Sequence, residues 1–358
     1  MELLSVTMND GVMPRSEIEG KDNSSEDKSN YKVVLTGDMV YNSMRMWQGA
    51  NGISPCDGIV SPAYTVLMPK IPISNGYFAA FFKSPNLINE FRKNSQGMTS
   101  DTWNLKYPQI ETIKVCIPAL SEQNRVADML RTLERRIAKQ AQLVDNLKKY
   151  KRGVMQRIFR QLPSQNGTEW TCVRLGDIFK KVSRRNTDGV IKNVITNSAE
   201  YGLIPQRDFF DKDIAVDGNT ANYYVIENGD FVYNPRKSNS APYGPFNRYT
   251  LSEQGIISPL YTCLVLQADI SPSYLAWYFK SDAWYRYIYD NGSQGVRHDR
   301  VSMTDDLLMG IPVMYPSHVK QLLYADIFDM VEARLQATQK TLDLLSKTRD
   351  GYMRQLFI

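Results

Sequence analysis

The sequence KKYKRGVMQRIF (148–159) recurs near the end of the chain as KTRDGYMRQLF (347–357). A shift of about 198 residues places Gly153 on Gly351 and Phe159 on Phe357. A repeat at this distance indicates that one chain carries two similar units.

Looser matches lie upstream of each copy. GDMVYNSMR (37–45) resembles GDFVYNPRK (229–237), and GIVSPAYTVL (58–67) resembles GIISPLYTCL (255–264). The second unit begins with residues 170 to about 192, which include Trp170 and Leu175. The first unit has no matching residues, because the match between the two units begins at Met1. We therefore expect the first unit to lack about 25–30 residues at its start, or to be completed in some other way.

Each repeat ends in a series of heptads with apolar residues at 3-4 spacing. This pattern predicts two long helices that pack in the coiled-coil manner. Gln140 and Lys151 interrupt the first seam, and Thr338 and Arg349 interrupt the second at the same repeat positions. The simplest partner for one seam is the other, although common descent also explains the coincidence. The apolar seam positions are Val126, Leu130, Leu133, Ile137, Val144, Leu147, Val154 and Ile158, and then Tyr324, Phe328, Val331, Leu335, Leu342, Leu345, Tyr352 and Leu356.

The ends of the first helix carry further signals. Ser121 follows Pro118 and is a plausible N-cap. Gly153 and Gly351 interrupt good helix patterns, which indicates either close packing or local fraying.

The rest of the chain has short β-branched and aromatic runs between Gly, Pro, Asn and Asp, together with short aromatic-rich helices at 77–83 and 274–280. This mixture predicts an α+β fold with two globular domains. A polar loop at 19–30 and a linker at 160–170 are expected. The predicted organisation is a domain at 1–120, a helix at 121–160, a domain at 161–318 and a helix at 319–358.

Composition excludes several classes of protein. No apolar run approaches the roughly 18 residues that span a membrane, and the N-terminus has no secretory pattern. The four cysteines are widely spaced and only two histidines occur, so we expect reduced thiols, a cytoplasmic protein and no metal site. Residues 121–160 hold 11 Lys/Arg against 4 Asp/Glu, which indicates a solvated helix face or an anionic partner, either DNA or an acidic protein.

The chain resembles the specificity (S) subunit of type I restriction–modification systems. IPALSEQNRVADMLRTLERRIAKQAQLVDNLKKYKRGVMQRIF (117–159) is similar to that family's central conserved region, and 311–357 is similar to its distal one. Trp170 with LGDI (175–178) resembles the opening of a target-recognition domain. The resemblance covers nearly the whole chain and departs from the family at the start of the first domain.

The resemblance implies a non-catalytic subunit. Its two domains would each read one half of a split site in double-stranded DNA, and its two helices would pair antiparallel as a spacer. Two methyltransferase (modification) subunits and restriction subunits would be the partners, and no cofactor is implied. An incomplete first domain also leaves self-association open.

Two other functions remain to be weighed, a stand-alone DNA methyltransferase or nuclease and a coiled-coil interaction scaffold. The sequence has no phosphate-binding loop of the GxxxxGK[ST] type. YNPR (233–236) contains Asn-Pro but lacks the Pro and aromatic residue of an adenine-methyltransferase motif. The Glu-x-Lys at 26–28 has no supporting acidic residue. We expect no catalytic residues.

Residue types that contact DNA gather in three clusters. Arg suits guanine, Asn and Gln suit adenine, and cations suit phosphate. The GD, YN and SQG motifs repeat between the two units, while the neighbouring residues expected to contact DNA differ. Two different half-sites require such a difference. The candidates are Asn42, Arg45, Trp47, Gln48, Asn234, Arg236, Lys237 and Asn239 after the two YN motifs, then Lys181, Arg184 and Arg185, and then Gln96, Thr99, Gln294, Arg297, His298 and Arg300 around the two SQG motifs.

Overall fold

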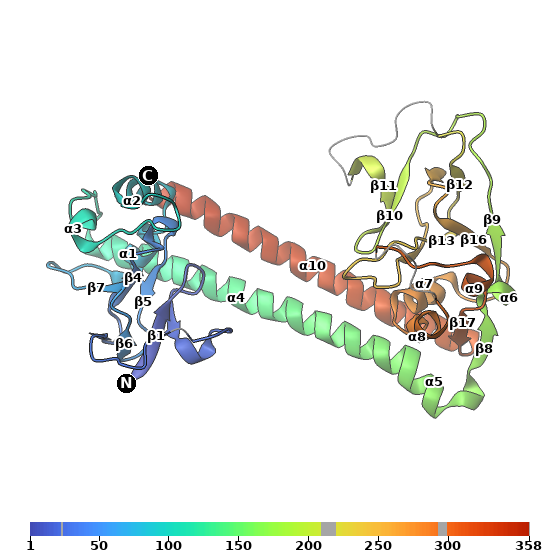
Figure 1. The fold of residues 1–358 in the computed structure, drawn as a ribbon, viewed down its shortest axis with the longest axis horizontal. Helices are drawn as coiled ribbons and strands as arrows, with labels where there is room; N and C mark the ends of the chain where they lie inside the picture. Colours follow the sequence, from blue (N-terminus) through green and yellow to red (C-terminus); the bar gives the residue numbers. More distant parts are fainter. Residues whose placement is uncertain (23, 209–219, 293–298, 358) are drawn as a thin grey trace. The chain divides into compact units, whose positions relative to one another are not determined.

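The computed structural model describes residues 1–22, 24–208, 220–292 and 299–357. The chain forms two compact units (Figure 1), one of residues 1–144 with 337–358 and the other of residues 145–336. We call them unit 1 and unit 2. The two long helices, α4 (Leu120–Gln156) and α10 (His318–Leu356), each contribute one part to unit 1 and another to unit 2.

The globular part of unit 1 contains two small sheets. One has the order β2-β1-β6-β3, in which β1 and β6 are parallel, and the other has the antiparallel order β5-β4-β7. Short helices follow β7. The elements are β1 (Glu2–Val6), β2 (Val12–Pro14), β3 (Lys32–Val34), β4 (Met39–Asn42), β5 (Asn51–Ile53), β6 (Gly58–Val60), β7 (Tyr64–Leu67), α1 (Asn75–Phe81), α2 (Pro85–Asn94) and α3 (Tyr107–Ile110).

Unit 2 also consists of small sheets and short helices, and it contains additional strand pairs. An antiparallel sheet has the order β14-β13-β16-β9, and three further pairs are β10-β11, β12-β15 and β17-β8. The elements are β8 (Thr171–Arg174), α6 (Leu175–Ile178), β9 (Phe179–Val182), β10 (Ile195–Ser198), β11 (Gly202–Pro205), β12 (Tyr224–Ile226), β13 (Phe231–Tyr233), β14 (Phe246–Arg248), β15 (Gly255–Ile257), β16 (Thr262–Leu266), α7 (Pro272–Lys280), α8 (Tyr285–Asn291), α9 (Asp305–Met309) and β17 (Pro312–Tyr315). The predicted α+β fold is confirmed.

The repeated GD motif forms the turn that leads into the central strand of each unit. The Asp38 carboxylate accepts a hydrogen bond from the Leu35 N–H at 2.9 Å, and Asp230 accepts one from the Glu227 N–H at the same distance. A carboxylate that binds a backbone N–H stabilises a turn. The motif is therefore part of the scaffold in both units.

A buried glutamine fixes the start of each long helix to its domain. The Gln123 side chain accepts from the Ser74 N–H at 3.0 Å and donates to the Pro118 carbonyl at 2.9 Å. Gln321 makes the same two contacts in unit 2, with Ser271 at 2.8 Å and Pro316 at 2.8 Å.

The prediction that Ser121 is an N-cap is wrong. Helix α4 begins at Leu120, and the N–H groups of Glu122 and Gln123 both point at the Ala119 carbonyl. Ser121 therefore lies within the first turn. The expected linker at 160–170 is also largely helical, because a π-helical turn (Arg157–Gln161) leads into α5 (Leu162–Gln165). Pro163, which has no N–H to donate, lies just after that turn.

The long helices are in contact and run antiparallel within each unit. In unit 1 the Gln140 side chain donates to the Thr338 carbonyl at 2.9 Å. In unit 2 the Lys151 ammonium and the Glu332 carboxylate form an ion pair at 2.6 Å, and the rings of Phe159 and Phe328 stack at 5.3 Å. Gln140 and Lys151, the polar interruptions of the first seam, therefore contact polar groups of the opposite helix, whereas Arg349 pairs with Asp350 of its own helix at 2.8 Å.

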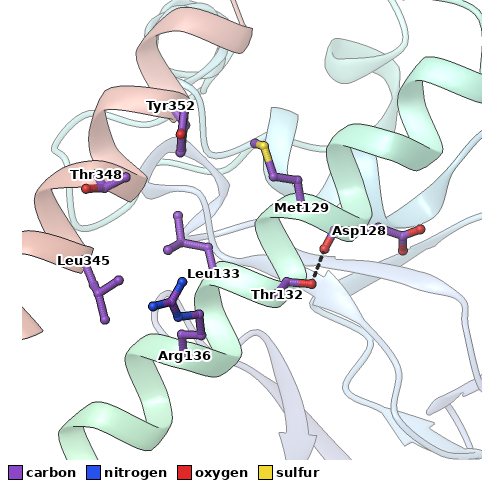
Figure 2. Close-up of a pocket in the computed structure, with 8 residues that line it drawn as sticks. All are labelled: Asp128, Met129, Thr132, Leu133, Arg136, Leu345, Thr348 and Tyr352. Atoms are coloured by element: carbon purple, nitrogen blue, oxygen red, sulfur yellow. Dashed lines mark hydrogen bonds between the residues drawn. The ribbon is translucent and has the colours of Figure 1, made fainter.

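More of the predicted seam positions are buried in the first helix than in the second. Val126, Leu130 and Leu133 are buried, and Leu133 and Leu345 approach each other across a cavity of about 470 Å³ (Figure 2). Tyr352 lines this cavity and is 39% exposed. The seam is therefore open at its Tyr352 end. Of the other predicted positions, Val144 and Phe328 are buried and Ile137, Leu147, Val331, Leu335 and Leu342 are half-buried.

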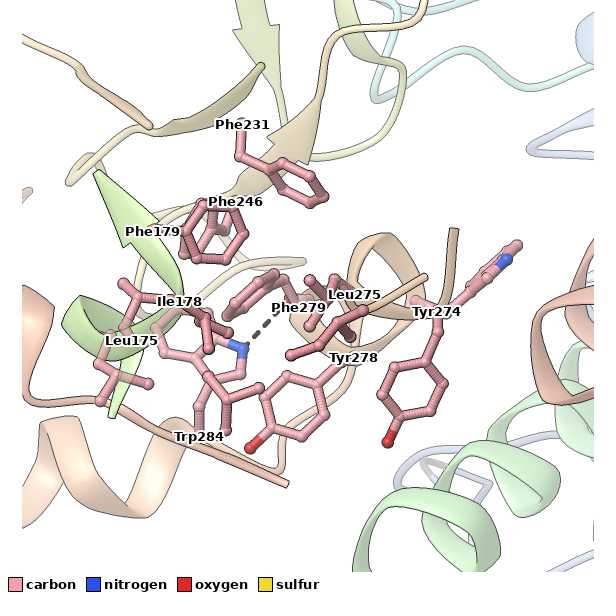
Figure 3. Close-up of a cluster of buried hydrophobic side chains, with 14 of the residues drawn as sticks. Leu175, Ile178, Phe179, Phe231, Phe246, Tyr274, Leu275, Tyr278, Phe279 and Trp284 are labelled. Carbon is pink, nitrogen blue, oxygen red and sulfur yellow. Dashed lines mark hydrogen bonds between the residues drawn. The ribbon is translucent and has the colours of Figure 1, made fainter. Parts of the chain in front are cut away.

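The last aromatic residue of each repeat anchors a helix end in a domain core. Phe357 stacks on Phe81 at 5.3 Å in unit 1, and Phe159 meets Tyr278 at 5.7 Å in unit 2. Aromatic pairs of this kind add to the free energy gained from burial. The core of unit 2 (Figure 3) is rich in aromatic rings from α7 and the main sheet.

Candidate nucleic-acid interface

The turn after the central strand has the same backbone frame in both units. The Asn42 N–H donates to the Ala50 carbonyl and the Asn234 N–H to the Pro245 carbonyl, each at 2.9 Å. Gly49 and Gly244 close these turns with φ of 83° and 85°, a conformation that favours glycine. A Cβ on Gly244 would collide with the Asn234 carbonyl.

The two predicted asparagines belong to this frame. Asn42 and Asn234 are 9% and 7% exposed. Their side-chain oxygens accept from the N–H groups of Met44 at 3.1 Å and Arg236 at 3.0 Å. A side-chain oxygen that accepts from the backbone two residues further on holds the turn. The structure therefore assigns both residues a structural role.

A second loop is joined to this turn in each unit. The Leu105 N–H donates to the Ser43 carbonyl at 2.8 Å, and the Val301 N–H donates to the Pro235 carbonyl at 2.9 Å. These loops are the ones that follow the SQG motifs. In unit 1 two of the predicted clusters, far apart in the sequence, therefore lie side by side, and in unit 2 the described member of the second cluster, Arg300, lies beside the turn.

In unit 1 this surface combines an aromatic anchor with free polar groups. Trp47, in a 3₁₀ turn (Met46–Gln48), meets Trp103 at 5.1 Å and donates to the Met44 carbonyl at 3.2 Å. Trp47 therefore holds the two loops together, and Gln48 beside it is half-buried. Arg45 is exposed.

The SQG loop of unit 1 presents polar side chains. Gln96 is exposed while its backbone pairs with Asn104, at 3.0 and 2.8 Å. Thr99 is also exposed, and its hydroxyl lies 3.4 Å from that of Thr102. Gln96 is thus fixed through its main chain and free in its side chain.

In unit 2 the corresponding surface is basic. Arg236 and Arg300 face each other across an antiparallel bridge. Arg236 is exposed and Arg300 is half-buried, and the guanidinium of Arg300 lies 3.9 Å from the carboxylate of Asp299. Burial raises the pKa of the Tyr261 phenol, and the charges of the two arginines oppose that shift. Lys237 is half-buried and Asn239 exposed on the same turn.

Sequence reasoning missed Tyr261. It lies in the motif that recurs as GIVSPAYT and GIISPLYT, and the tyrosine present in both copies could have marked it as a residue beside the turn. The sequence alone did not show that the motif's tyrosine approaches Arg236.

The third predicted cluster is engaged inside unit 2. Lys181 pairs with Asp305 at 2.6 Å. Arg184 pairs with Asp230 at 2.7 Å and with Glu227 at 3.2 Å. Burial raises the pKa of Asp230, and the positive charge of Arg184 opposes this. Arg184 therefore compensates a buried carboxylate of the GD turn.

Arg185 is also engaged, since it donates to the Asn222 side chain at 3.0 Å and lies over the Tyr224 ring. The remaining predicted residues, Gln294, Arg297 and His298, lie outside the described residues.

Within the described ranges of the chain, no group of three or more His, Cys, Asp or Glu side chains is placed to hold a metal ion. Among the same residues, no helix has the length and apolar character needed to cross a membrane.

Comparison with family models and with curated proteins gave no match to this sequence. Three solved structures are similar to it. The HsdS subunit from Thermoanaerobacter tengcongensis is 16% identical, with 93% of this chain and 83% of that chain covered and a TM-score of 0.48. The S subunit of a type I restriction–modification system from M. genitalium is 15% identical, with 91% and 84% covered and a TM-score of 0.56.

A third chain comes from a structure that describes complex assembly and conformational transition of the type I restriction–modification system. It is 17% identical, with 93% and 84% covered and a TM-score of 0.51. The last two comparisons extend over both domains and both long helices. The chain therefore has the fold of the specificity subunits of type I restriction–modification systems.

Proposed function

We propose that this protein is a non-catalytic, sequence-specific DNA-binding subunit of a type I restriction–modification complex. The observation that carries the proposal is the pair of matched loop platforms. In each unit the turn after the central strand is hydrogen-bonded to the loop after the SQG motif, and the frame is the same while the exposed side chains differ. Two different half-sites require such an arrangement.

The side chains on the two platforms favour different contacts. Arg236 and Arg300 in unit 2 suit guanine edges or phosphates, because a guanidinium donates two parallel hydrogen bonds. Arg45 and Gln96 in unit 1 form a mixed set, in which Gln96 suits adenine. We do not propose base contacts for Asn42, Asn234 or Arg184, because each is already bound within the fold.

The proposal includes the partners and the organisation of the chain. The domains at 1–120 and 161–318 would read DNA, and the helices at 121–160 and 319–358 would separate them and bind partners. Those partners would be two methyltransferase subunits and restriction subunits, in the cytoplasm. The basic excess of the first helix supports an anionic partner.

A selection from randomised double-stranded DNA tests this function. The chain is assembled with its modification subunits, and the enriched sequences are determined. We expect a split, asymmetric motif, and an affinity that falls with salt. If about six phosphates are neutralised, the slope of log K against log salt is about −5. No preference for any sequence would contradict the proposal.

The enzyme alternative has its own test. The chain alone is incubated with DNA and S-adenosylmethionine, and separately with DNA and Mg²⁺. We expect neither methyl transfer nor cleavage, and turnover in either reaction would replace our proposal with a catalytic one.

A further inference from the structure

The outer edge of unit 2 is closed by residues 170–182. Strand β8 pairs with β17, helix α6 follows, and strand β9 pairs with β16. Leu175, Ile178 and Phe179 of this segment are 0%, 3% and 4% exposed. Figure 3 shows them within the aromatic core. The segment is therefore a structural part of the domain.

Among the described residues, unit 1 has no counterpart of this segment. Strand β7, the equivalent of β16, pairs with β4 on one side and lies at the edge of its sheet. Residues 114–117, the equivalent of β17, form no strand. Both neighbours that residues 170–182 supply in unit 2 are thus missing in unit 1.

The side chains at this edge show the same difference. Val313 on β17 is 0% exposed, whereas its equivalent Val115 is 39% exposed. Met68, just after β7, is 84% exposed. Phe279, which touches Phe179 in unit 2, is 2% exposed, while its equivalent Phe82 is only half-buried. Unit 1 therefore exposes apolar surface where unit 2 is covered.

The outward-facing backbone N–H groups of β7 in unit 1 can be identified by comparison with β16 in unit 2. There the Gln267 N–H donates to the Ile178 carbonyl at 2.8 Å. Because N–H groups alternate in direction along an antiparallel strand, residues 263 and 265 face the same way. Their equivalents in unit 1 are Val66 and Met68, and an open strand edge of this kind accepts an added strand.

We propose that unit 1 binds a strand–helix–strand segment supplied from outside residues 1–358, with the chemistry of residues 170–182. Such a segment has three apolar side chains at the positions of Leu175, Ile178 and Phe179. It also has an aspartate that accepts from the backbone, as Asp177 does from the Arg174 N–H at 2.8 Å. The inference does not depend on DNA recognition.

The repeat itself identifies the occupant, because equivalent strands in the same molecule are covered by this segment. A second copy of the chain is a poorer occupant. It would have to withdraw Leu175, Ile178 and Phe179 from its own core. We therefore assign the edge to a segment from outside residues 1–358.

Cysteine chemistry gives a direct test. In unit 2 Cys172 lies opposite Met314, and the unit 1 equivalent of Met314 is the exposed Cys116. Since the Leu175 N–H donates to the Ile311 carbonyl at 2.8 Å, alternation makes the Met314–Cys172 pair a non-hydrogen-bonded one. The Cα atoms of such pairs are about 4.5 Å apart, which a disulfide can bridge.

The probe is the peptide WTCVRLGDIFKKV (170–182) with its cysteine carried as a mixed disulfide with thionitrobenzoate. It is added to the chain of residues 1–358 in which Cys172→Ser removes the competing exposed thiol. The Cys116 thiolate attacks the peptide sulfur, a protein–peptide disulfide forms, and coloured thionitrobenzoate leaves. Burial raises the pKa of Cys263 to about 12, so that thiol does not compete.

We expect exchange at Cys116 at least about tenfold faster than with a control peptide carrying Leu175→Asp and Ile178→Asp, because docking raises the local concentration. Mass spectrometry should map the link to Cys116 and not to Cys56. Val115→Asp in the protein should remove the rate difference while Cys116 still reacts with the control peptide.

Equal rates for the two peptides would overturn the proposal, and so would a link at Cys56. A stable dimer of the chain that excludes the peptide would also overturn it, by showing that a second copy covers the edge.

Discussion

The Gln140 side chain donates a hydrogen bond to the Thr338 carbonyl at 2.9 Å, and these two residues occupy the same position of the repeat, 198 residues apart. Each is one of two polar residues that interrupt its apolar seam. A polar layer in a coiled coil specifies register at a cost in stability.

Two replacements of the glutamine separate the contribution of its hydrogen bond from the contribution of packing in the seam. Gln140→Leu should change the free energy of unfolding by less than about 1 kcal/mol, because one lost hydrogen bond is offset by apolar burial. Gln140→Ala loses both and should cost about 1–2 kcal/mol. Urea denaturation of the two variants measures the difference. Equal losses would show that the seam gains nothing from leucine at this position.

The buried glutamines predict local and separable effects. Gln321→Ala leaves the Ser271 N–H and the Pro316 carbonyl without their partner and should cost about 2 kcal/mol. Amide exchange should accelerate near residue 271 and remain unchanged near Ser74. Gln123→Ala is the matched control, with the opposite pattern. Acceleration in both units from one substitution would contradict independent anchoring.

The Lys151–Glu332 pair predicts a pH dependence. Burial acts to raise the pKa of Glu332, but the hydrogen bond and charge of Lys151 outweigh it, so the pKa is lowered. A lowered pKa in the folded state contributes stability above the unfolded value of about 4.3, and this is lost as the pH falls through the folded value.

Glu332→Gln should therefore cost about 1 kcal/mol at pH 7 and nearly nothing at pH 3, the small size reflecting the partial exposure of the pair. Thermal unfolding at both pH values measures this. Glu90→Gln, at an exposed pair with Lys93, is the control and should have little effect at either pH. A loss from Glu332→Gln that persists at pH 3 would show that the side chain acts through packing.

The basic platform of unit 2 predicts a change in DNA binding without a change in folding. Arg236→Ala and Arg300→Ala should each weaken the assembled complex by about 1–3 kcal/mol, at one half-site only. Arg286→Ala removes an exposed arginine of the same unit, on α8, and should leave affinity unchanged. Fluorescence anisotropy with each half-site altered in turn provides the measurement. Equal losses at both half-sites would contradict independent reading.

The helices and the repeated strands could be predicted from the sequence because their signals are local. A 3.5-residue seam needs only neighbouring turns of one helix to be recognised. The opening at Tyr352 was not predicted, since it depends on how the facing helix fills the space.

The candidate site was harder to predict, because its residues find partners far away in the sequence. Lys181 pairs with Asp305, 124 residues further on, and Arg184 with Asp230, 46 residues further on. In the sequence, basic residues that form ion pairs with distant carboxylates cannot be distinguished from basic residues that are free to bind phosphate. The same holds for Asn42 and Asn234, since only the folded turn shows that their side-chain oxygens accept hydrogen bonds from the backbone.

The division between frame and exposed side chains in these turns bears on how such a protein evolves. Gly49, Gly244 and the two buried asparagines fix the backbone, while Arg45 and Arg236 extend from it into solvent. Substitution at an exposed position of this kind usually changes stability by less than about 0.5 kcal/mol. A lineage can therefore exchange the side chains of these loops through viable, folded intermediates, and so drift from one preference to another without passing through a misfolded ancestor.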